Sequence, residues 1–342
     1  MQRRIVGIAL LLAGIVLLLA TARNLWSQPD RIAAQLSVSL PLVLVLLLDL
    51  AAVRFLFSER PGSRLRSLCI GFLSVVSAAM VTYEGAVLYV DNQLAADRHA
   101  GIFESCYKVW GARGLVTATS QIVKDGTQNT IESVSLAFDE GATGCEIDVF
   151  FDEQLGQFIV SHDRPYHLKN GKLLPLSEMM AAVGGRGYIW LDFKKLRHLS
   201  DAGLAAAVAE LQEITDEYGG RDKMYVEGED PLHLSAFRDA GFPTILDTHP
   251  LADSHFVTPA LINIYKLLYH FGDFTVMGMN YGALEDPIYG ERTKAALGNI
   301  PMFIYHVEPD PAILQSLATS GSVRVILVEN QSLNRYRLSG CP

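Results

Sequence analysis

Two acidic residues, Glu146 and Asp148, are two positions apart inside the apolar run 144–149. Successive side chains of a β-strand point to opposite faces, so this spacing puts both carboxylates on one face. Such a pair offers the oxygen ligands that Mg2+ and Ca2+ bind. A solvated surface is the alternative, but the neighbours Cys145 and Ile147 are apolar, and a buried carboxylate needs a partner or a metal. The pattern therefore favours a metal site.

A histidine follows the next apolar run, Phe158–Val160, in the sequence Ser161-His162-Asp163. Imidazole titrates near neutral pH and can carry protons to and from a reacting group. A His-Asp dipeptide by itself is common in turns. Together with the acidic pair, His162 provides what metal-assisted chemistry on a phosphate group needs, namely ligands for a hard cation and a group that moves protons.

The two-residue spacing recurs at Asp192 and Lys194, at the end of the run 188–193. A carboxylate and an ammonium group on one face could join the same site, although strand ends are polar in many proteins. Polar residues also end the later strand-like runs; these are Glu227, Asp247, Asn280, His306 and Glu308. For these later residues a structural role is the more common reason, and a shared site is the alternative.

Short strand-like runs alternate with helical stretches from residue 113 onward. The predicted strands are 115–119, 145–150, 188–193, 224–227, 244–247, 274–279, 302–306 and 323–328, with an additional run at 157–161. The predicted helices are 130–139, 202–218, 232–240, 259–270 and 311–318. Eight such units predict an α/β fold of the (β/α)8 TIM-barrel class, with a doubly wound open sheet as the alternative. A barrel would collect the polar residues at the C-terminal ends of its strands.

Three apolar runs precede this part of the chain, at 5–22, 38–57 and 68–90. Each approaches the roughly 20 residues that cross a bilayer. The first could be a signal peptide, because it follows a short basic lead, but two further runs and the lack of a clear small-x-small cleavage site favour a retained helix. The chain is therefore predicted to begin with a transmembrane region of about three helices, 1–92, followed by a linker, 93–112, and the barrel, 113–342.

Arginines set the predicted topology. Arg3 and Arg4 precede the first run, and Arg60, Arg64 and Arg66 lie near the second connection. By the positive-inside rule these segments face the cytoplasm, which predicts a multi-pass protein of the cell inner membrane with its barrel on the extracytoplasmic, periplasmic side.

Cysteine usage and charge limit the classes of partner. Cys106 and Cys341 bracket the part after the apolar runs and could pair outside the cytoplasm, and no cysteine spacing typical of a metal site occurs. The chain has a formal net charge of −9, which argues against a nucleic-acid partner. Gly-rich phosphate loops, a serine nucleophile elbow and an HExxH motif are also missing from the sequence.

The segment from Asn129-Thr130 through Gly144-Cys145-Glu146-Ile147-Asp148-Val149 to Val160-Ser161-His162-Asp163 resembles the glycerophosphodiester phosphodiesterase family. Leu191-Asp192-Phe193-Lys194 looks like the later Glu-x-Lys strand of that family. The resemblance covers about residues 125–195. It implies a TIM barrel that binds a divalent cation, Mg2+ or Ca2+, and that cleaves glycerophosphodiesters with two histidines as general acid and base.

Position by position, the resemblance assigns roles to six residues. Glu146, Asp148 and Asp192 would be metal ligands, and His162 would be one of the two catalytic proton-transfer residues. The resemblance also implies that Lys194 contacts the phosphate of the substrate and that Asn129 lies in the substrate-binding part of the site.

The sequence also departs from the family pattern. The family carries its first histidine in a His-Arg-Gly at the end of the first strand, and the predicted first strand here has no histidine. Gln128 stands where the family has the glutamate of a Glu-Asn-Thr motif. Loss of a positioned acid or base typically costs roughly 10²–10⁴-fold in rate. His249 or His306 could supply the missing group from a later strand.

Two principal hypotheses follow. The first is a membrane-anchored phosphoric diester hydrolase that uses a divalent cation on glycerophosphodiesters or phospholipid headgroups. The alternative is a catalytically impaired barrel, a pseudoenzyme that binds a headgroup, a cation or a protein partner at the membrane. A third possibility, an inert structural membrane component, predicts no metal binding.

Overall fold

The computed structural model describes residues 64–95, 108–115, 128–169, 171–255, 257–308 and 310–328. The chain divides into two compact units. One comprises residues 1–96, 251–267 and 290–298, and the other comprises residues 97–250, 268–289 and 299–342. The predicted apolar spans 5–22 and 38–57 lie outside the described residues.

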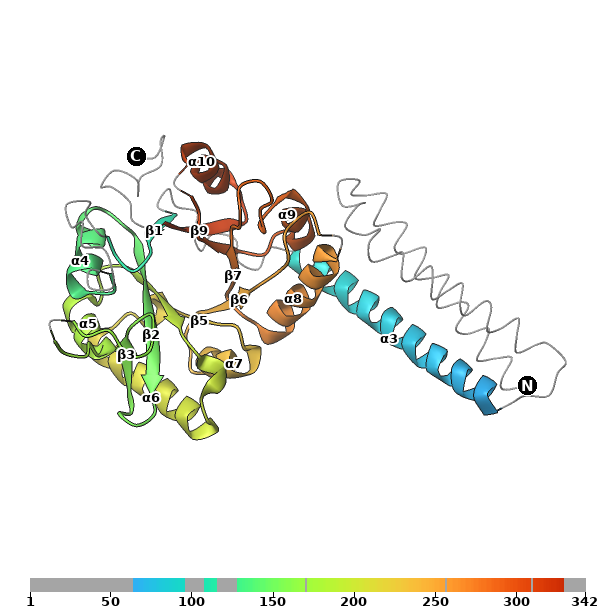
Figure 1. Cartoon of the computed structure of the whole chain (residues 1–342), viewed down its shortest axis with the longest axis horizontal. Helices are drawn as coiled ribbons and strands as arrows, with labels where there is room; N and C mark the ends of the chain where they lie inside the picture. Colours follow the sequence, from blue (N-terminus) through green and yellow to red (C-terminus); the bar gives the residue numbers. More distant parts are fainter. Residues whose placement is uncertain are drawn as a thin grey trace. The chain divides into compact units, whose positions relative to one another are not determined.

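The second unit contains a closed parallel β-barrel (Figure 1). Its eight parallel strands are β1 (Val109–Gly111), β2 (Gly144–Asp152), β4 (Tyr188–Phe193), β5 (Met224–Gly228), β6 (Thr244–Thr248), β7 (Val276–Asn280), β8 (Met302–Tyr305) and β9 (Val323–Val328). Neighbouring strands pair in chain order, and β1 pairs with both β2 and β9, which closes the ring. The antiparallel strand β3 (Gln157–Val160) pairs with β2 outside this ring. The TIM-barrel prediction is confirmed and the open sheet is excluded.

Aromatic side chains fill the interior of the barrel. Trp110 of β1, Trp190 of β4 and Phe303 of β8 are each at most 1% exposed and belong to one apolar cluster. The rings of Trp110 and Phe303 lie 5.5 Å apart, and those of Trp190 and Phe303 lie 5.2 Å apart. Because side chains alternate along a strand, the residue two positions after Trp190 on the same face is Asp192. The same alternation of side chains that points aromatic rings into the barrel interior therefore points carboxylates to its opening, at the C-terminal ends of the strands.

Strand register aligns these carboxylates. Asp148 of β2 is paired in register with Asp192 of β4, and Asp192 is paired with Glu227 of β5. Adjacent strands lie about 4.8 Å apart, so residues in register on one face are near neighbours. Three acids predicted from separate segments therefore form a row across the C-terminal ends of three strands.

Helices α4 (Ile131–Asp139), α5 (Leu176–Val183), α6 (Asp201–Tyr218), α7 (Pro231–Asp239) and α10 (Pro311–Thr319) lie outside the strands of the barrel (Figure 1). A capping box begins α4: Thr130 Oγ accepts a hydrogen bond from the backbone N–H of Ser133, and Ser133 Oγ accepts one from that of Thr130. The sequence did not predict α5. Its eight residues are shorter than the windows in which helical periodicity is clear.

The predicted position of the first barrel strand is wrong. The strand that pairs with β2 and β9 is Val109–Gly111, within the interval assigned to a linker, whereas 116–119 lie outside the described residues. A strand of three residues is too short to show a period, and its residues, Val109, Trp110 and Gly111, do not alternate between apolar and polar types. The error matters, because the residues after β1 line the mouth of the barrel.

The first unit contains α3 (Arg64–Leu94), most of which comes from the predicted apolar span 68–90, together with α9 (Glu291–Leu297) and the first part of α8 (Thr258–Gly272). Lys266 of α8, only 3% exposed, forms an ion pair with Asp91 of α3 and donates to the carbonyl of Ala296 at 2.8 Å. Among the described helices, none combines the length and the apolar character that crossing a membrane requires. The predicted membrane bundle is thus not confirmed.

The cysteines give no described disulfide. Cys145 on β2 is a free and fully buried thiol. Burial is the main cause that raises its pKa, so this thiol is held in its protonated form. Cys106 and Cys341, whose pairing the sequence left open, lie outside the described residues.

Candidate active site

A cavity of about 680 Å³ opens at the C-terminal ends of the barrel strands. Its walls carry side chains from the ends of β1, β2, β4, β5, β6 and β8 and from the turn after β3. The charged residues among its lining are Arg113, Glu146, Asp163, Arg164, Asp192, Lys194, Lys195, Arg197, Glu227, Glu229, Asp230 and Asp247. This is the face on which TIM-barrel enzymes build their active sites.

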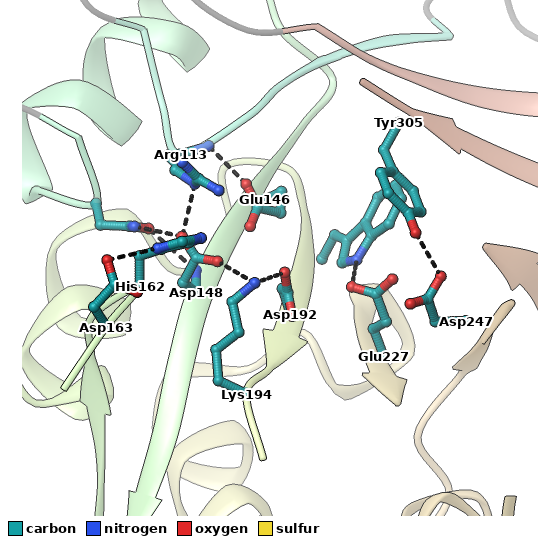
Figure 2. Close-up of polar contacts among 12 residues, drawn as sticks. Arg113, Glu146, Asp148, His162, Asp163, Asp192, Lys194, Glu227, Asp247 and Tyr305 are labelled. Atoms are coloured by element: carbon teal, nitrogen blue, oxygen red, sulfur yellow. Dashed lines mark hydrogen bonds and ion pairs between the residues drawn. The ribbon is translucent and has the colours of Figure 1, made fainter. Parts of the chain in front are cut away.

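Asp148 is the centre of the polar contacts at this face (Figure 2). Its carboxylate is fully buried, and one oxygen, Oδ2, contacts Arg113 Nε at 2.8 Å and accepts from Asn129 Nδ2 at 2.7 Å. The other oxygen, Oδ1, lies 2.9 Å from Lys194 Nζ. Burial acts to raise the pKa of Asp148, but the charges of Lys194 and Arg113 outweigh it and lower that pKa, so Asp148 is ionised.

Glu146 has the opposite electrostatic environment. Its carboxylate is buried and accepts a hydrogen bond of 2.8 Å from the backbone N–H of Arg113. Burial, followed by the nearby charges of Asp148 and Asp192, raises its pKa well above the ordinary value. Burial also raises the pKa of Asp192 to about 6, although Lys194 forms an ion pair with it and acts in the other direction. Both carboxyl groups therefore tend to hold a proton, and a bound cation would displace it.

These three acids fit a divalent cation. Ligand oxygens of Glu146, Asp148 and Asp192 lie within 4.8 Å of one another. Fully ionised, the three carboxylates carry −3 against +2 from Arg113 and Lys194, which leaves one buried negative charge without compensation. An all-oxygen donor set with excess negative charge is what Mg2+ and Ca2+ bind. The structure therefore brings the three predicted metal ligands together.

The fold and the site invite comparison with known proteins. No family model matches this chain, and no curated protein matches it. The barrel is similar to solved glycerophosphodiester phosphodiesterases. One from Parabacteroides distasonis is 17% identical with a TM-score of 0.47, covering 65% of this chain and 92% of that one. A phosphodiesterase from Oleispira antarctica, solved with the product sn-glycerol-3-phosphate, is 13% identical with a TM-score of 0.45, covering 65% and 95%.

A third solved structure, a putative glycerophosphoryl diester phosphodiesterase from Silicibacter pomeroyi, is 16% identical with a TM-score of 0.47, covering 65% of this chain and 90% of that one. Identities this low concern the fold alone. The strand order of the barrel already establishes that fold.

The residue after β1 is an alanine, Ala112, where the resemblance implies the first histidine. β1 is followed by Ala112-Arg113-Gly114, which matches the family's His-Arg-Gly in its last two residues. Ala112 lines the cavity, so the place is at the site but carries no imidazole. The Arg-Gly pair was the sequence signal for this position. It was missed because the first strand was predicted to begin at residue 115, six residues after the start of β1. Arg113, which contacts Asp148 and Glu146, was missed with it.

His162 lies at the cavity as predicted, in the turn after β3. Its Nδ1 lies 2.9 Å from Asp163 Oδ2. The hydrogen bond from His162 lowers the pKa of Asp163, so that carboxylate is ionised and only accepts. The Nδ1 of His162 therefore carries a proton toward Asp163, and this hydrogen bond orients the ring.

Two predicted substrate-binding residues have different positions. Lys194 lines the cavity and contacts Asp148 and Asp192. Asn129 is buried and contacts Asp148 twice: its Nδ2 donates to the carboxylate, and its Oδ1 accepts from the Asp148 backbone N–H at 3.1 Å. Asn129 is not among the residues that line the cavity, so in this structure it positions Asp148.

A second cluster of polar side chains lies on another wall of the cavity. From the sequence, Glu227 and Asp247 of this cluster could be assigned only to the ends of strands. Trp190 Nε1 donates to the buried carboxylate of Glu227 at 2.7 Å, and Tyr305 OH donates to Asp247 Oδ1 at 3.0 Å (Figure 2). His249 Nε2 lies 3.1 Å from Asp247 Oδ2 and 3.0 Å from Glu229 Oε1. Only the barrel closure reveals that these groups face the same cavity as Glu146.

Proposed function

We propose that this protein is a phosphoric diester hydrolase that acts on glycerophosphodiesters or phospholipid headgroups with the aid of a divalent cation. The observation that carries the proposal is that Glu146, Asp192, Lys194 and His162 line one cavity, while the fully buried Asp148 contacts Lys194 and has a ligand oxygen within 4.8 Å of those of Glu146 and Asp192. Three carboxylates, a fixed ammonium group and an imidazole form a set suited to the chemistry of a phosphate diester.

Each residue of this set has a task in the proposed reaction. Glu146, Asp148 and Asp192 would hold the cation, which when bound neutralises phosphate charge. Lys194, fixed by two carboxylates, presents its ammonium group to a phosphate oxygen. His162, with Asp163 on its Nδ1, accepts a proton from the attacking water at Nε2.

The proposal includes the membrane. The apolar runs 5–22 and 38–57 and the arginines near them support a multi-pass anchor in the cell inner membrane. Such an anchor would hold the cavity near lipid-derived diesters. Reaction of the chain in intact and in opened membrane vesicles with a protease that cuts the barrel would show on which side of the membrane the barrel lies.

The test of the activity uses the purified full-length chain with glycerophosphodiesters and lysophospholipids, in Mg2+, in Ca2+ and in EDTA. We expect cation-dependent release of a phosphomonoester and an alcohol, and a loss of at least about 100-fold in Glu146→Gln and in His162→Ala. Glu178→Gln, on α5 away from the cavity lining, serves as the control. Full activity in both site variants would contradict the proposal.

Ala112 favours a second candidate function. A barrel that lacks the family's first histidine could bind a headgroup and a cation without turnover. Calorimetric titration with Ca2+ and with glycerophosphodiesters separates the two cases. Binding without hydrolysis in the wild-type chain would establish the pseudoenzyme, whereas hydrolysis lost in His162→Ala with binding retained would establish the enzyme.

A further inference from the structure

We propose that His249, at the end of β6, is the second catalytic proton-transfer residue of this barrel and protonates the leaving alcohol. The inference rests on the proposed phosphodiester hydrolysis and adds a residue to it. It assigns the task of the missing first-strand histidine to the opposite wall of the cavity.

The barrel closure places His249 across from Ala112. In the ring of eight parallel strands, β6 is separated from β1 by three strands on either side. Ala112 and His249 line the same cavity as Glu146 and Asp192. A phosphate bound at the carboxylates of β2 and β4 would therefore meet His162 from the β3 turn on one side and His249 on another. In-line displacement at phosphorus needs the attacking and the leaving oxygens on opposite sides.

Two carboxylates hold the imidazole of His249. Its Nε2 lies 3.0 Å from Glu229 Oε1 and 3.1 Å from Asp247 Oδ2. Each carboxylate is itself held: Tyr305 OH donates to the other oxygen of Asp247, and Arg197 Nη1 lies 3.3 Å from the other oxygen of Glu229. A carboxylate on one ring nitrogen fixes the orientation of an imidazole and favours its charged form.

The charged surroundings favour an acid over a base. The hydrogen bond to Asp247 is the largest cause that raises the pKa of His249, and Glu229 adds to it, so that pKa rises to about 9. At neutral pH the ring is an imidazolium ion that has a proton to give. Glu227 faces the same part of the cavity and, through burial, favours its protonated form. The role of base then falls to His162, whose ring is oriented by Asp163 at Nδ1.

His306, the other candidate for the missing histidine, has a different partner. Its Nδ1 contacts the neutral side-chain amide of Asn280 at 3.0 Å. His306 also lines the cavity, so it cannot serve as a control for His249. His270 of α8 provides the control, because it is not among the residues that line the cavity.

The proposed step balances in atoms and protons. A water oxygen forms a bond to phosphorus and loses one proton to His162 Nε2. The bond from phosphorus to the alkoxy oxygen breaks, the electron pair stays on that oxygen, and the imidazolium of His249, held by its Nε2 proton to the two carboxylates, gives it the proton on Nδ1. The products are a phosphomonoester and an alcohol. Exchange of protons with solvent then returns His162 to its neutral form and His249 to its charged form.

The experiment compares two leaving groups in the full-length chain. Glycerophosphoethanolamine has an alkoxide leaving group that needs a proton, whereas bis(4-nitrophenyl) phosphate releases a phenolate that does not. We expect His249→Gln to lower kcat for the first substrate by about 100-fold or more and for the second by less than about 5-fold, with KM unchanged. His270→Gln should keep both rates within about 3-fold of the wild type.

Several results would overturn the proposal. Equal losses on both substrates would show a role in structure or binding, and no loss on the alkyl diester would show that His249 is idle. A fall in the number of bound Ca2+ or Mn2+ ions in His249→Gln, measured by calorimetry, would make the residue a cation ligand. A wild-type chain that hydrolyses neither substrate would overturn the proposed function and this inference together. If His162→Ala loses hydrolysis of the alkyl diester while His249→Gln keeps it, only this inference is overturned.

Discussion

At the scale of single residues, Glu146 and Asp148 show that identical spacing on one strand does not give identical electrostatics. Both carboxylates are buried on the same face of β2. Asp148 is paired with two cations and its pKa is lowered, whereas Glu146 is paired with a backbone N–H and its pKa is raised. One residue is a permanent anion that orders the site, and the other exchanges a proton for a cation.

This difference predicts that two isosteric substitutions have unequal effects on stability. Asp148→Asn removes the anion that holds Arg113 and Lys194, and loss of one partner of a buried ion pair typically costs about 3–5 kcal/mol. Glu146→Gln mimics the protonated acid, so in the absence of a divalent cation we expect a change in the free energy of unfolding of less than about 1 kcal/mol. Chemical denaturation in EDTA at pH 7 measures both. Similar losses in the two variants would contradict this assignment.

At the scale of elements, the junction between β1 and α4 decides the geometry of Arg113. Gly114 adopts a φ of +84°, and a Cβ atom there would lie 2.5 Å from the backbone carbon of Ser133 in the first turn of α4. Ser133 Oγ in turn donates to the carbonyl oxygen of Arg113 at 3.1 Å. The close approach of strand and helix thus needs glycine and fixes the residue that contacts Asp148.

Gly114→Ala is therefore expected to be costly. The left-handed conformation alone costs a non-glycine residue about 1–2 kcal/mol, and the clash with Ser133 adds to this. Gly156→Ala is the matched control, because Gly156 also has a positive φ, +64°, with open space around its Cβ position. We expect Gly114→Ala to lower the free energy of unfolding by at least about 2 kcal/mol more than Gly156→Ala. Equal effects in thermal or chemical denaturation would show that the junction can relax.

The contact between α6 and β3 predicts a dependence of stability on pH. Glu210 of α6 accepts a hydrogen bond of 2.7 Å from the backbone N–H of Phe158, and burial raises its pKa to about 7. The folded state then holds this proton more tightly than the unfolded state, whose pKa is 4.5. Stability from this group is therefore greatest below pH 4.5 and is lost as the pH rises toward 7.

Glu210→Gln should flatten this part of the profile, because the amide keeps the acceptor oxygen and does not ionise. We expect the wild type to lose on the order of 1 kcal/mol relative to the variant between pH 4.5 and pH 7. Denaturation at a series of pH values gives the difference. A parallel pair of profiles would refute the raised pKa of Glu210 in the folded chain.

At the scale of the whole molecule, a closed ring of strands gathers charge from distant segments into one cavity. Residues 113, 146, 192, 227 and 247 reach the cavity from β1, β2, β4, β5 and β6. Burial of Glu146 beside Asp148 and Asp192 makes ionisation of its carboxyl group costly, and a bound cation would offset this cost. Cation binding should thus stabilise the folded chain as a whole.

This stabilisation can be measured without any substrate. At a cation concentration of 100 times Kd, linkage gives about 2.7 kcal/mol, so Mg2+ or Ca2+ should raise Tm by several degrees. Glu146→Gln should reduce that rise, whereas Glu178→Gln should keep it. An equal rise in Tm for wild type and Glu146→Gln would place the bound cation elsewhere. The measurement remains informative even if the chain has no hydrolytic activity.

The sequence predicted most of the strands closely, because apolar runs of five to nine residues carry a clear pattern. The predicted strands at 188–193 and 323–328 agree with β4 and β9 residue for residue. The three-residue β1 carried too little pattern and was misplaced. With it, the sequence interpretation missed Arg113 and the correspondence of Ala112 to the family's histidine.

By itself, the sequence determined which chemical groups are available. The spacing of Glu146 and Asp148, and of Asp192 and Lys194, set which side chains share a face, because period-2 alternation is a local property of the backbone. It could not say which groups neutralise each other, since that depends on contacts between strands far apart in the chain.

Only the tertiary structure decided those pairings. Barrel closure and register brought Arg113 and Lys194 to Asp148 and left Glu146 without a side-chain cation of its own among the described contacts. The same closure put His249 between two carboxylates on the wall opposite Ala112. Electrostatic interaction depends on distance in space and on burial, and neither quantity is contained in the order of residues along the chain.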